Sequence, residues 1–447
     1  MTSTSTATTP DLAKIAARSA QRAAELERPV LATAGLGMPS NEVISLPDHE
    51  VAGIWLEPGL EVAGAGSAAE VEATGPDKYA ELSGALEELL SDAVTDGTLP
   101  FAFCGGSFNS IADGWEGFPE AIAWIPEIAV RRDSEGCTLI VSTLVQPGET
   151  GADARMAALL TSGMPAPVPG GVKAAPVGAY SSDDASFDEA VADALERIAA
   201  GELTKVVLAR RLRMRSAEGV SPSALADTLA ARYPDCFTYG VRRGDAAFVG
   251  ASPELLVARE ADLVRATPAA GTVKGSQKPS ESRKLAGGLD TPKSRLEQEL
   301  VADAVYDVLE PLCTQVSAHL PMVVPAGPVQ HLSTLIEGIL REPVPVLDLV
   351  AALHPTPAVG GVPLGAAKGV IELHENFSRG WYAGPVGIVR PDGTGSFAVA
   401  LRGALLRGSQ IDLFAGAGIV EGSVPHEERR EIELKLGAVA AALVPER

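Results

Sequence analysis

The stretch that organises this chain is residues 414–435, FAGAGIVEGSVPHEERREIELK, close to the C-terminus. Residues 415–418 are all alanine or glycine, small enough for backbone N–H groups to approach an anionic ligand directly. The second half predicts a helix, because Ser423 can cap it and Pro425 suits its first turn. We therefore expect a ligand-binding glycine turn that leads straight into a helix.

The helix predicted from this stretch carries three charged residues on one face. Glu428, Glu431 and Lys435 are spaced i, i+3, i+7, so they meet whatever the glycine turn holds. A solvated helix with an ordinary Glu431–Lys435 ion pair, worth about 0.2–0.5 kcal/mol, would show the same pattern. The rest of the chain decides between these two interpretations.

The composition of the 447 residues, 46% hydrophobic and 21% charged, is that of a globular protein. A net charge of −22 argues against a nucleic-acid partner, because phosphate binding relies on lysine and arginine patches. The four cysteines show neither a CxxC pair nor metal-ligand spacing, which favours reduced thiols in a cytosolic protein. The N-terminus lacks a signal-peptide pattern, and no apolar run approaches the length of a membrane span. We expect a cytoplasmic protein with neither a nucleic-acid nor a membrane partner.

The pattern along the chain predicts hairpin strands that alternate with helices. Residues 1–10 predict a disordered tail, and the Pro-, Gly- and Ala-rich residues 147–178 predict a linker or surface loop. Helices are predicted over 12–26, 78–94, from a capping box at 186–189 to about 201, and over 221–232, 293–309, 346–353 and 366–374. Short strands are predicted within 42–145 and over 205–210, 237–241, 246–250, 255–258, 329–335, 383–390, 395–402 and 410–415. Without a βαβ rhythm, this order predicts an α+β fold of large, mixed, mostly antiparallel β-sheets with helices packed outside.

A carboxylate occupies the predicted inward face of the helix over 293–309. Glu297 shares that face with Leu300, Val301, Ala304 and Val308. A buried carboxylate is costly unless a cation or hydrogen bonds compensate it. Glu297 is therefore either a functional group or the partner of a basic residue at the start of the helix.

Other polar residues also interrupt apolar segments. Lys205 begins an apolar strand, where it can point into a cleft or snorkel at the strand edge. Glu254 lies in a turn between two apolar strands, and Arg402 ends a strand where it can pair with a carboxylate. For His331 and His354, near strand and helix ends, we favour structural roles.

Residues 205–435 resemble the chorismate-utilising enzymes, a family that includes isochorismate, salicylate, anthranilate and aminodeoxychorismate synthases. The matching blocks, in family order, are TKVVLARR, FVGASPELLV, AAGTVKG, KSRLEQELV, VQHLSTLIEG, LHPTPAVGGVP, WYAGPVG, ALRGALL, FAGAGIV and EERREIELK. FCGGSFN and AWIPEIAV resemble the N-terminal part of the same fold, that of anthranilate synthase component I. The resemblance implies an N-terminal tail and short helix over 1–41, a strand-rich part of the same fold over 42–180, and a chorismate-binding catalytic region over 181–447.

Within the family, the chain looks most like isochorismate synthase. Lys205 stands where ammonia-using members typically have glutamine and water-adding members have lysine, and HPTPAV at 354–359 resembles the isochorismate synthase loop. Tyr382 matches a tyrosine of salicylate synthases, so that activity, which also eliminates pyruvate, stays an open alternative. Ser294 and Gln298 depart from a more acidic, His-containing version of the helix motif but leave Glu297 in place.

The resemblance implies an isomerase of the hydroxymutase type that converts chorismate into isochorismate. Water adds at C2 of the ring while the C4 hydroxyl leaves, with Lys205 as the base and Glu254 as the acid. Lys205 must be neutral part of the time, and the pKa of Glu254 must be raised, which an apolar turn would achieve. No amidotransferase signature accompanies the chain, so we expect no amidotransferase subunit and a monomer. Both menaquinone and siderophore biosynthesis could use the product.

The resemblance also implies the ligands of Mg²⁺ and the contacts of the substrate. Glu297 and Glu431 would bind Mg²⁺ directly, and Glu428 would act through water. The pyruvyl carboxylate would be held by Arg402, Lys435 and the N–H groups around Ala417 and Gly418, with Tyr382 nearby. Gly271 and Thr272 would line the C4 side of the ring, and Ala358 would contact the substrate as well.

Overall fold

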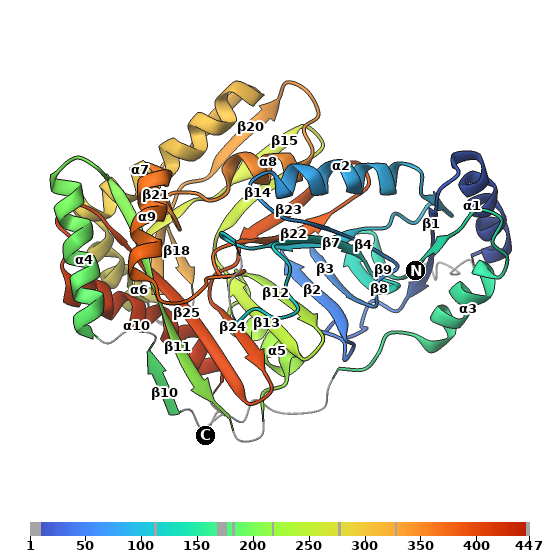
Figure 1. The fold of residues 1–447 in the computed structure, drawn as a ribbon, viewed down its shortest axis with the longest axis horizontal. Coiled ribbons are helices and arrows are strands. Elements are labelled where there is room, and N and C mark those ends of the chain that lie inside the picture. The colour runs from blue at the N-terminus through green and yellow to red at the C-terminus, as the bar shows by residue number, and fades with distance from the viewer. Residues whose placement is uncertain are drawn as a thin grey trace.

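The computed structural model describes residues 10–110, 114–167, 177–180, 184–216, 219–275, 279–326 and 329–443. The molecule is elongated, with helices α1 (Leu12–Leu26) and α3 (Ala152–Ser162) at one end and α4 (Asp184–Ala199), α9 (Leu364–His374) and α10 (Pro425–Ala442) at the other (Figure 1). The tail predicted over residues 1–10 falls almost entirely outside the described residues.

The larger β-sheet joins the two ends of the molecule. Within the described ranges it has thirteen strands, in the order β10-β11-β25-β24-β13-β12-β2-β3-β8-β9-β1-β5, with β21 paired to β11. The strands are β10 (Val177–Tyr180), β11 (Lys205–Arg215), β25 (Gln410–Ile419), β24 (Gly403–Arg407), β13 (Ala246–Ser252), β12 (Phe237–Arg243), β2 (Val51–Glu57), β3 (Leu60–Ala65), β8 (Ile128–Asp133), β9 (Gly136–Val145), β1 (Val30–Met38), β5 (Val94–Thr95) and β21 (Gly361–Val362). Strands from both sequence halves form one continuous sheet.

A second sheet of nine strands and a third of three complete the β-structure of the described residues. The second has the order β17 (Cys313–Ala318), β20 (Ile336–Leu340), β15 (Leu263–Ala266), β14 (Leu255–Glu260), β23 (Gly395–Val399), β22 (Pro385–Val389), β6 (Ala102–Gly106), β7 (Ala121–Ile125) and β4 (Ala69–Ala73). The third has the order β16 (Ala269–Lys274), β19 (Val329–Ser333) and β18 (Met322–Ala326). Every described strand pair is antiparallel except β1 with β5, which confirms the predicted fold class.

The two larger sheets pack face to face around the main apolar core. Phe103 of β6 lies against Gly53 and Gly64 of the larger sheet, where an added Cβ would come within 3.0 Å of its ring. The same ring stacks on Trp124 with 5.2 Å between ring centroids. Glycine on one sheet and aromatic residues on the other therefore let the layers approach closely.

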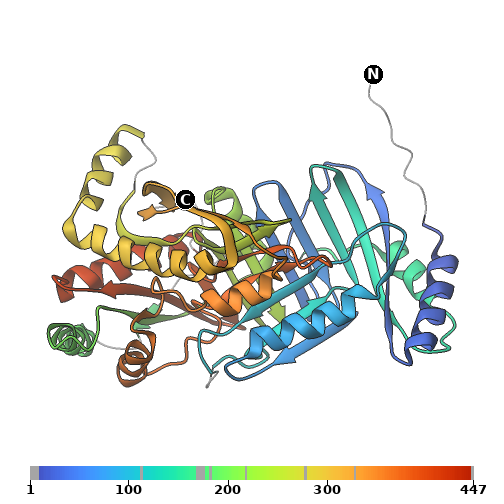
Figure 2. The ribbon, with the colours of Figure 1, turned by 90° about the horizontal axis from the view of Figure 1, so that it is seen from above.

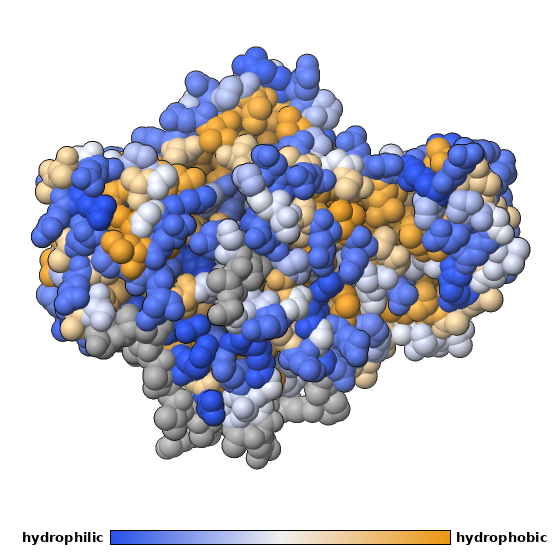
Figure 3. All heavy atoms as spheres, viewed as in Figure 1, coloured by the Kyte–Doolittle hydropathy of each residue, from blue (hydrophilic) through white to orange (hydrophobic). Residues whose placement is uncertain are grey.

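Helices cover the outer surfaces of the sheets, as Figure 2 shows from above. Helix α2 (Lys78–Ser91) packs against α8 (Val346–Leu353), α5 (Pro222–Arg232) lies on β12 and β13, and α10 lies on β25. Helix α7 (Pro292–Leu309) packs against β16 next to α6 (Pro279–Ala286). Hydrophilic side chains spread over much of the surface in Figure 3, with apolar areas between them.

Several local predictions are wrong. Helix α3 occupies part of the predicted linker over 147–178, of which residues 168–176 lie outside the described ones, and β1 lies where only a tail and a helix were expected. Helix α4 already begins at Asp184, so the capping box at 186–189 lies inside it. Val424, and not Ser423, precedes the first residue of α10, because the Ser423 hydroxyl instead accepts a hydrogen bond from Val420 N.

The glycine turn predicted over 415–418 is also wrong. These residues continue strand β25, which pairs with β11 from Gln410 to Ile419. The buried face of α7 differs as well: it consists of Glu297, Gln298, Val301, Val305 and Leu309, so only Glu297 and Val301 of the predicted set are fully buried. All four cysteines are free and buried, as expected. No described helix is long and apolar enough to cross a membrane.

Candidate active site

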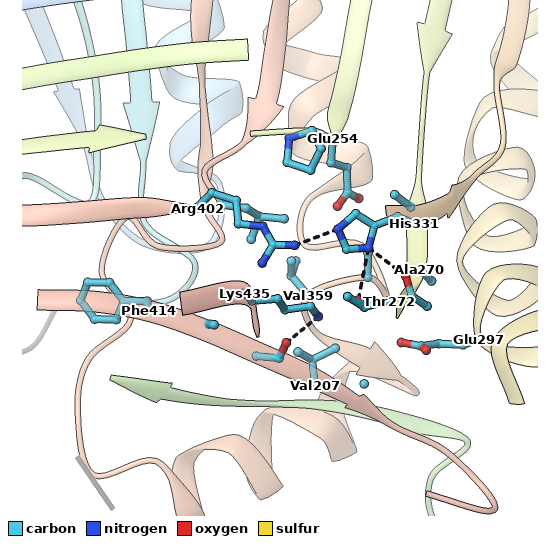
Figure 4. Close-up of a pocket in the computed structure, with 18 of the residues that line it drawn as sticks. Val207, Glu254, Ala270, Thr272, Glu297, His331, Val359, Arg402, Phe414 and Lys435 are labelled. Carbon is cyan, nitrogen blue, oxygen red and sulfur yellow. Dashed lines mark hydrogen bonds between the residues drawn. The ribbon is translucent and has the colours of Figure 1, made fainter. Parts of the chain in front are cut away.

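A cavity of about 60 Å³ lies where the ends of several distant elements meet (Figure 4). It is bordered by β11, β16, α7, β25, α10 and the turns around residues 253, 358 and 401. Its lining consists of Val207, Pro253, Glu254, Ala269, Ala270, Gly271, Thr272, Glu297, His331, Ala358, Val359, Tyr382, Leu401, Arg402, Phe414, Ala415, Gly416, Gly418 and Lys435. Ligand pockets usually measure about 300–1,000 Å³, so the charged side chains leave this one narrow.

Lys205 lies behind this cavity in contact with Glu297. Its side chain is 0% exposed, and its Nζ lies 3.2 Å from Glu297 Oε1 but makes no hydrogen bond within the described chain. Gly418 makes room for this pair, because an added Cβ would stand 2.0 Å from Glu297 Oε1 and 3.0 Å from Lys205 Cε. The snorkelling interpretation of Lys205 is therefore wrong, and the small residues of β25 make space for charged side chains.

Glu254 lies on the opposite side of the cavity, in the turn between β13 and β14. The carboxyl is 3% exposed, and burial raises its pKa to about 8, against the opposing charge of Lys205 and a hydrogen bond from the Ala269 backbone. An acid with this pKa is mostly protonated at neutral pH. The expected rise in the pKa of Glu254 is therefore present in the fold itself.

Arg402 is held in position by His331. Arg402 Nη2 lies 2.8 Å from His331 Nε2, while His331 Nδ1 lies 2.8 Å from Gly271 O and 3.2 Å from Thr272 Oγ1. A carbonyl oxygen can only accept a hydrogen bond, which assigns the hydrogen to Nδ1 and leaves Nε2 to accept from Arg402. Burial, and then the charge of Arg402, lowers the pKa of His331 to about 3, so the imidazole is neutral.

The guanidinium of Arg402 also retains a free donor. Its Nε is buried and has no hydrogen-bond partner among the described residues. The residue adopts a positive φ of 52°, a conformation that is uncommon outside glycine and often found at functional sites. Arg402 thus places a buried cation with an unused N–H group in the wall of the cavity.

Lys435 and Tyr382 complete the polar wall near β25. Lys435 Nζ donates to Gly416 O at 2.8 Å and pairs with Glu431 Oε1 at 2.6 Å. Although burial opposes ionisation, the charge of Lys435 and its hydrogen bond lower the pKa of Glu431. Burial raises the pKa of Tyr382 to about 12, so its hydroxyl stays protonated. The ordinary i,i+4 ion pair is thus present, and Lys435 borders the cavity at the same time.

The glutamates expected to bind a metal are each paired with a lysine. Glu428 pairs with Lys293, and its Oε2 is buried without a hydrogen-bond partner in the described structure. Burial opposes the charge of Lys293, but Glu428, Glu431 and Glu297 together raise its pKa, which shows that all three are within electrostatic reach. Among the described residues, no group of three His, Cys, Asp or Glu is arranged to hold a metal ion. Carboxylate oxygens are the donors that Mg²⁺ prefers, and Glu428 Oε2 is an unused one, so the donor set fits this ion in chemistry.

The structure brings most of the predicted site residues together. Glu254, Gly271, Thr272, Glu297, Ala358, Tyr382, Arg402, Gly418 and Lys435 line the cavity, whereas Lys205, Ala417, Glu428 and Glu431 do not. The side chain of Ala417 packs in the main core, and the contact expected between its backbone N–H group and the substrate stays a prediction. The structural role assigned to His331 missed its place in the wall beside Arg402. Its position in the block VQHLSTLIEG was the one available signal.

Comparison with known proteins shows to which family the chain belongs. The model for "Chorismate binding enzyme" matches residues 54–444. The chain is 36% identical over 448 residues to the salicylate biosynthesis isochorismate synthase of Pseudomonas aeruginosa, covering 95% of this chain and 93% of that protein. It is 33% identical to the isochorismate synthase MenF of Bacillus subtilis, covering 78% and 75%.

Solved structures agree on the fold. A putative 2,3-dihydroxybenzoate-specific isochorismate synthase from Bacillus anthracis superposes with a TM-score of 0.72 at 26% identity, covering 88% of this chain and 96% of that one. Anthranilate synthase component I from Streptococcus pneumoniae, at 21% identity, has the same fold with a TM-score of 0.67 over 90% and 95%. The chain therefore belongs to the family of chorismate-binding enzymes.

Proposed function

We propose that this protein is an isochorismate synthase. The observation that carries the proposal is Glu254, a carboxyl with a pKa of about 8 that faces the same cavity as two cations, Arg402 and Lys435. Several relatives that are at least 30% identical are named isochorismate synthases, which supports the same activity here.

The two cations suit the two carboxylates of chorismate. Arg402, fixed through Nη2 by His331, has its Nε free to donate to a carboxylate, and Lys435 lies on the wall near β25. Charge-assisted hydrogen bonds of this kind are stronger than neutral ones. Their positions in the cavity would orient the ring with C4 towards Glu254.

Glu254 and Lys205 would move the protons. A water molecule adds its oxygen to C2 while Lys205, as the base, takes the proton that this water loses. The ring double bonds shift, the C4–oxygen bond breaks, and Glu254 gives its proton to the departing hydroxyl, which leaves as water. One water enters and one leaves, so the product is an isomer of chorismate. Glu297 lines the cavity and contacts Lys205, so it would hold the lysine in position behind the cavity.

Mg²⁺ is part of the proposal. Glu297, Glu431 and Glu428 would hold it, and the bound ion would neutralise a substrate carboxylate. Each of these glutamates is already paired with a lysine, so the ion would supply the further positive charge that a dianionic substrate needs. A cytoplasmic monomer stays a prediction, as does the pathway that uses the product.

The test is to incubate the purified chain with chorismate and Mg²⁺ and to separate the products chromatographically. We expect isochorismate, and we expect no conversion with Lys205→Ala. Salicylate together with pyruvate would favour the salicylate synthase alternative, and unchanged chorismate would refute both activities.

A further inference from the structure

A second pocket, of about 410 Å³, shares no lining residue with the candidate active site. Helix α2, the start of α8, the β22–β23 turn and the end of β14 border it, and these elements lie close together in Figure 1. Its lining consists of Ser83, Leu86, Glu87, Leu90, Arg259, Pro343, Pro345, Leu347, Asp348, Val389, Arg390, Pro391, Asp392 and Gly393. Its volume is in the range of small-molecule sites.

The pocket contains a buried cation that lacks a counter-charge. Arg259 is 7% exposed, and it donates hydrogen bonds from Nε to Ala261 O at 2.9 Å and from Nη1 to Asp392 O at 3.4 Å. Within the described chain it forms no ion pair, and its Nη2 donates to no protein atom. A buried charge that pairs only with carbonyl groups is costly, and a carboxylate would compensate it.

The surroundings keep this guanidinium accessible from the pocket. Gly393, with a positive φ of 73°, stands beside it, and an added Cβ would lie 3.1 Å from Arg259 Nη1. Arg390, a second arginine without an ion pair in the described structure, lines the same pocket. Part of the wall is apolar, with Leu86, Leu90 and Leu347 almost fully buried. The pocket thus has arginine side chains on one part of its lining and apolar side chains on another.

Three carboxylates limit the charge of the ligand. Glu87 and Asp392 are exposed, Asp348 is half-buried, and Asp392 Oδ1 is already bound by the backbone and hydroxyl of Thr394. Charges in water are screened, so the buried guanidinium dominates its own corner, but the acidic rim disfavours a molecule with several negative charges. The ligand class that fits this pocket is therefore a monocarboxylate with an apolar body. Chorismate does not belong to this class, because it carries two negative charges.

Three elements run from this pocket to the candidate active site. Strand β14 extends from the residue after Glu254 to Arg259 and beyond, and β23 leads from the turn at Gly393 towards Arg402. Helix α8 leads from Leu347 to the loop that carries Ala358.

We propose that this pocket binds a small apolar monocarboxylate as an effector, with Arg259 and Arg390 donating hydrogen bonds to its carboxylate. Only the effect on turnover rests on the proposed function.

The test titrates phenylacetate into the full chain by isothermal calorimetry. We expect a dissociation constant on the order of 1–10 mM, typical of so small a ligand. Arg259→Met, which keeps the bulk and removes the charge, should weaken binding at least about tenfold. Arg402→Gln should leave binding intact, and the uncharged phenylacetamide should not bind. Absence of phenylacetate binding, or equal binding by Arg259→Met, would overturn the site, as would binding lost only in Arg402→Gln.

The effector role is measured separately through the KM for chorismate. Saturating phenylacetate should change this KM by about fivefold or more in the wild type and leave it unchanged in Arg259→Met. A change that persists in Arg259→Met would place phenylacetate in the active site and overturn the proposal, and binding with no kinetic change would overturn the effector role. If Arg259→Met does not fold, Arg390→Met takes its place with the same expected losses. Because calorimetry needs no turnover, failure of the proposed activity would leave the binding test decisive.

Discussion

Replacing Gly418 by alanine should disable the enzyme at small cost to its stability. The added Cβ would stand 2.0 Å from Glu297 Oε1 and 3.0 Å from Lys205 Cε. Non-bonded atoms prefer about 3.5 Å, so the carboxylate must move by roughly 1.5 Å. The Lys205–Glu297 contact would be disturbed with it.

The expected loss of activity follows from this displacement. A misplacement of about 1 Å at a catalytic group can cost about 100-fold in rate, so kcat at saturating chorismate and Mg²⁺ should fall by about that factor. Glu297 Oε1 is the end of a flexible side chain, so the free energy of unfolding should fall by only about 1 kcal/mol.

Gly369→Ala is the matched control for this substitution. Apart from its chain neighbours and the backbone of helix α9 itself, no atom lies within 4 Å of the Cβ that it would add, so activity should be unchanged. Chemical denaturation of the two variants gives the change in the free energy of unfolding, and steady-state kinetics give the change in kcat. If Gly418→Ala keeps wild-type kcat, the charged pair behind the cavity has no part in turnover and the reasoning is wrong.

The remaining predictions concern individual side chains of the site. Lys205→Ala should lower kcat by about 10²–10⁴ with KM little changed, and a kcat within about threefold of wild type would remove its role as base. The pKa of Glu254 is raised to about 8, so its proton is available below that pH and lost above it. The rate should therefore decline as pH rises through about 8, and Glu254→Gln should lose activity along with this decline. His331→Leu removes the acceptor for Arg402 Nη2 and should raise KM for chorismate about tenfold, more than it lowers kcat. EDTA should abolish activity and Glu431→Ala should abolish Mg²⁺ binding measured by calorimetry, whereas full activity of that variant without metal would contradict the proposed ligands.

The sequence predicted the fold class from local patterns, and it predicted most of the cavity through the resemblance to the chorismate-utilising enzymes. Alternating apolar strands with hairpin turns determine an antiparallel architecture, and charged residues such as Glu254 and Arg402 stand out inside apolar segments. Burial of these residues is costly, which marked them as candidates, and the resemblance joined them in one site.

The rest depends on tertiary contacts that sequence spacing does not encode. Residues 415–418 have the composition of a turn, yet pairing with β11 extends them as a strand. The partner of Glu297 is Lys205 on a distant strand, and the helix-start Lys293 pairs instead with Glu428. His331 resembled a structural histidine because its contact with Arg402 joins residues 71 positions apart.

The most direct test of the central claim is the reaction in water enriched in oxygen-18. Chorismate and isochorismate have the same mass, but addition of water at C2 places one heavy oxygen in the product. The account predicts isochorismate that carries a single oxygen-18 at C2, formed by the wild-type protein and not by Lys205→Ala. Isochorismate without the label, or labelled product formed at the wild-type rate by Lys205→Ala, would contradict water addition assisted by Lys205.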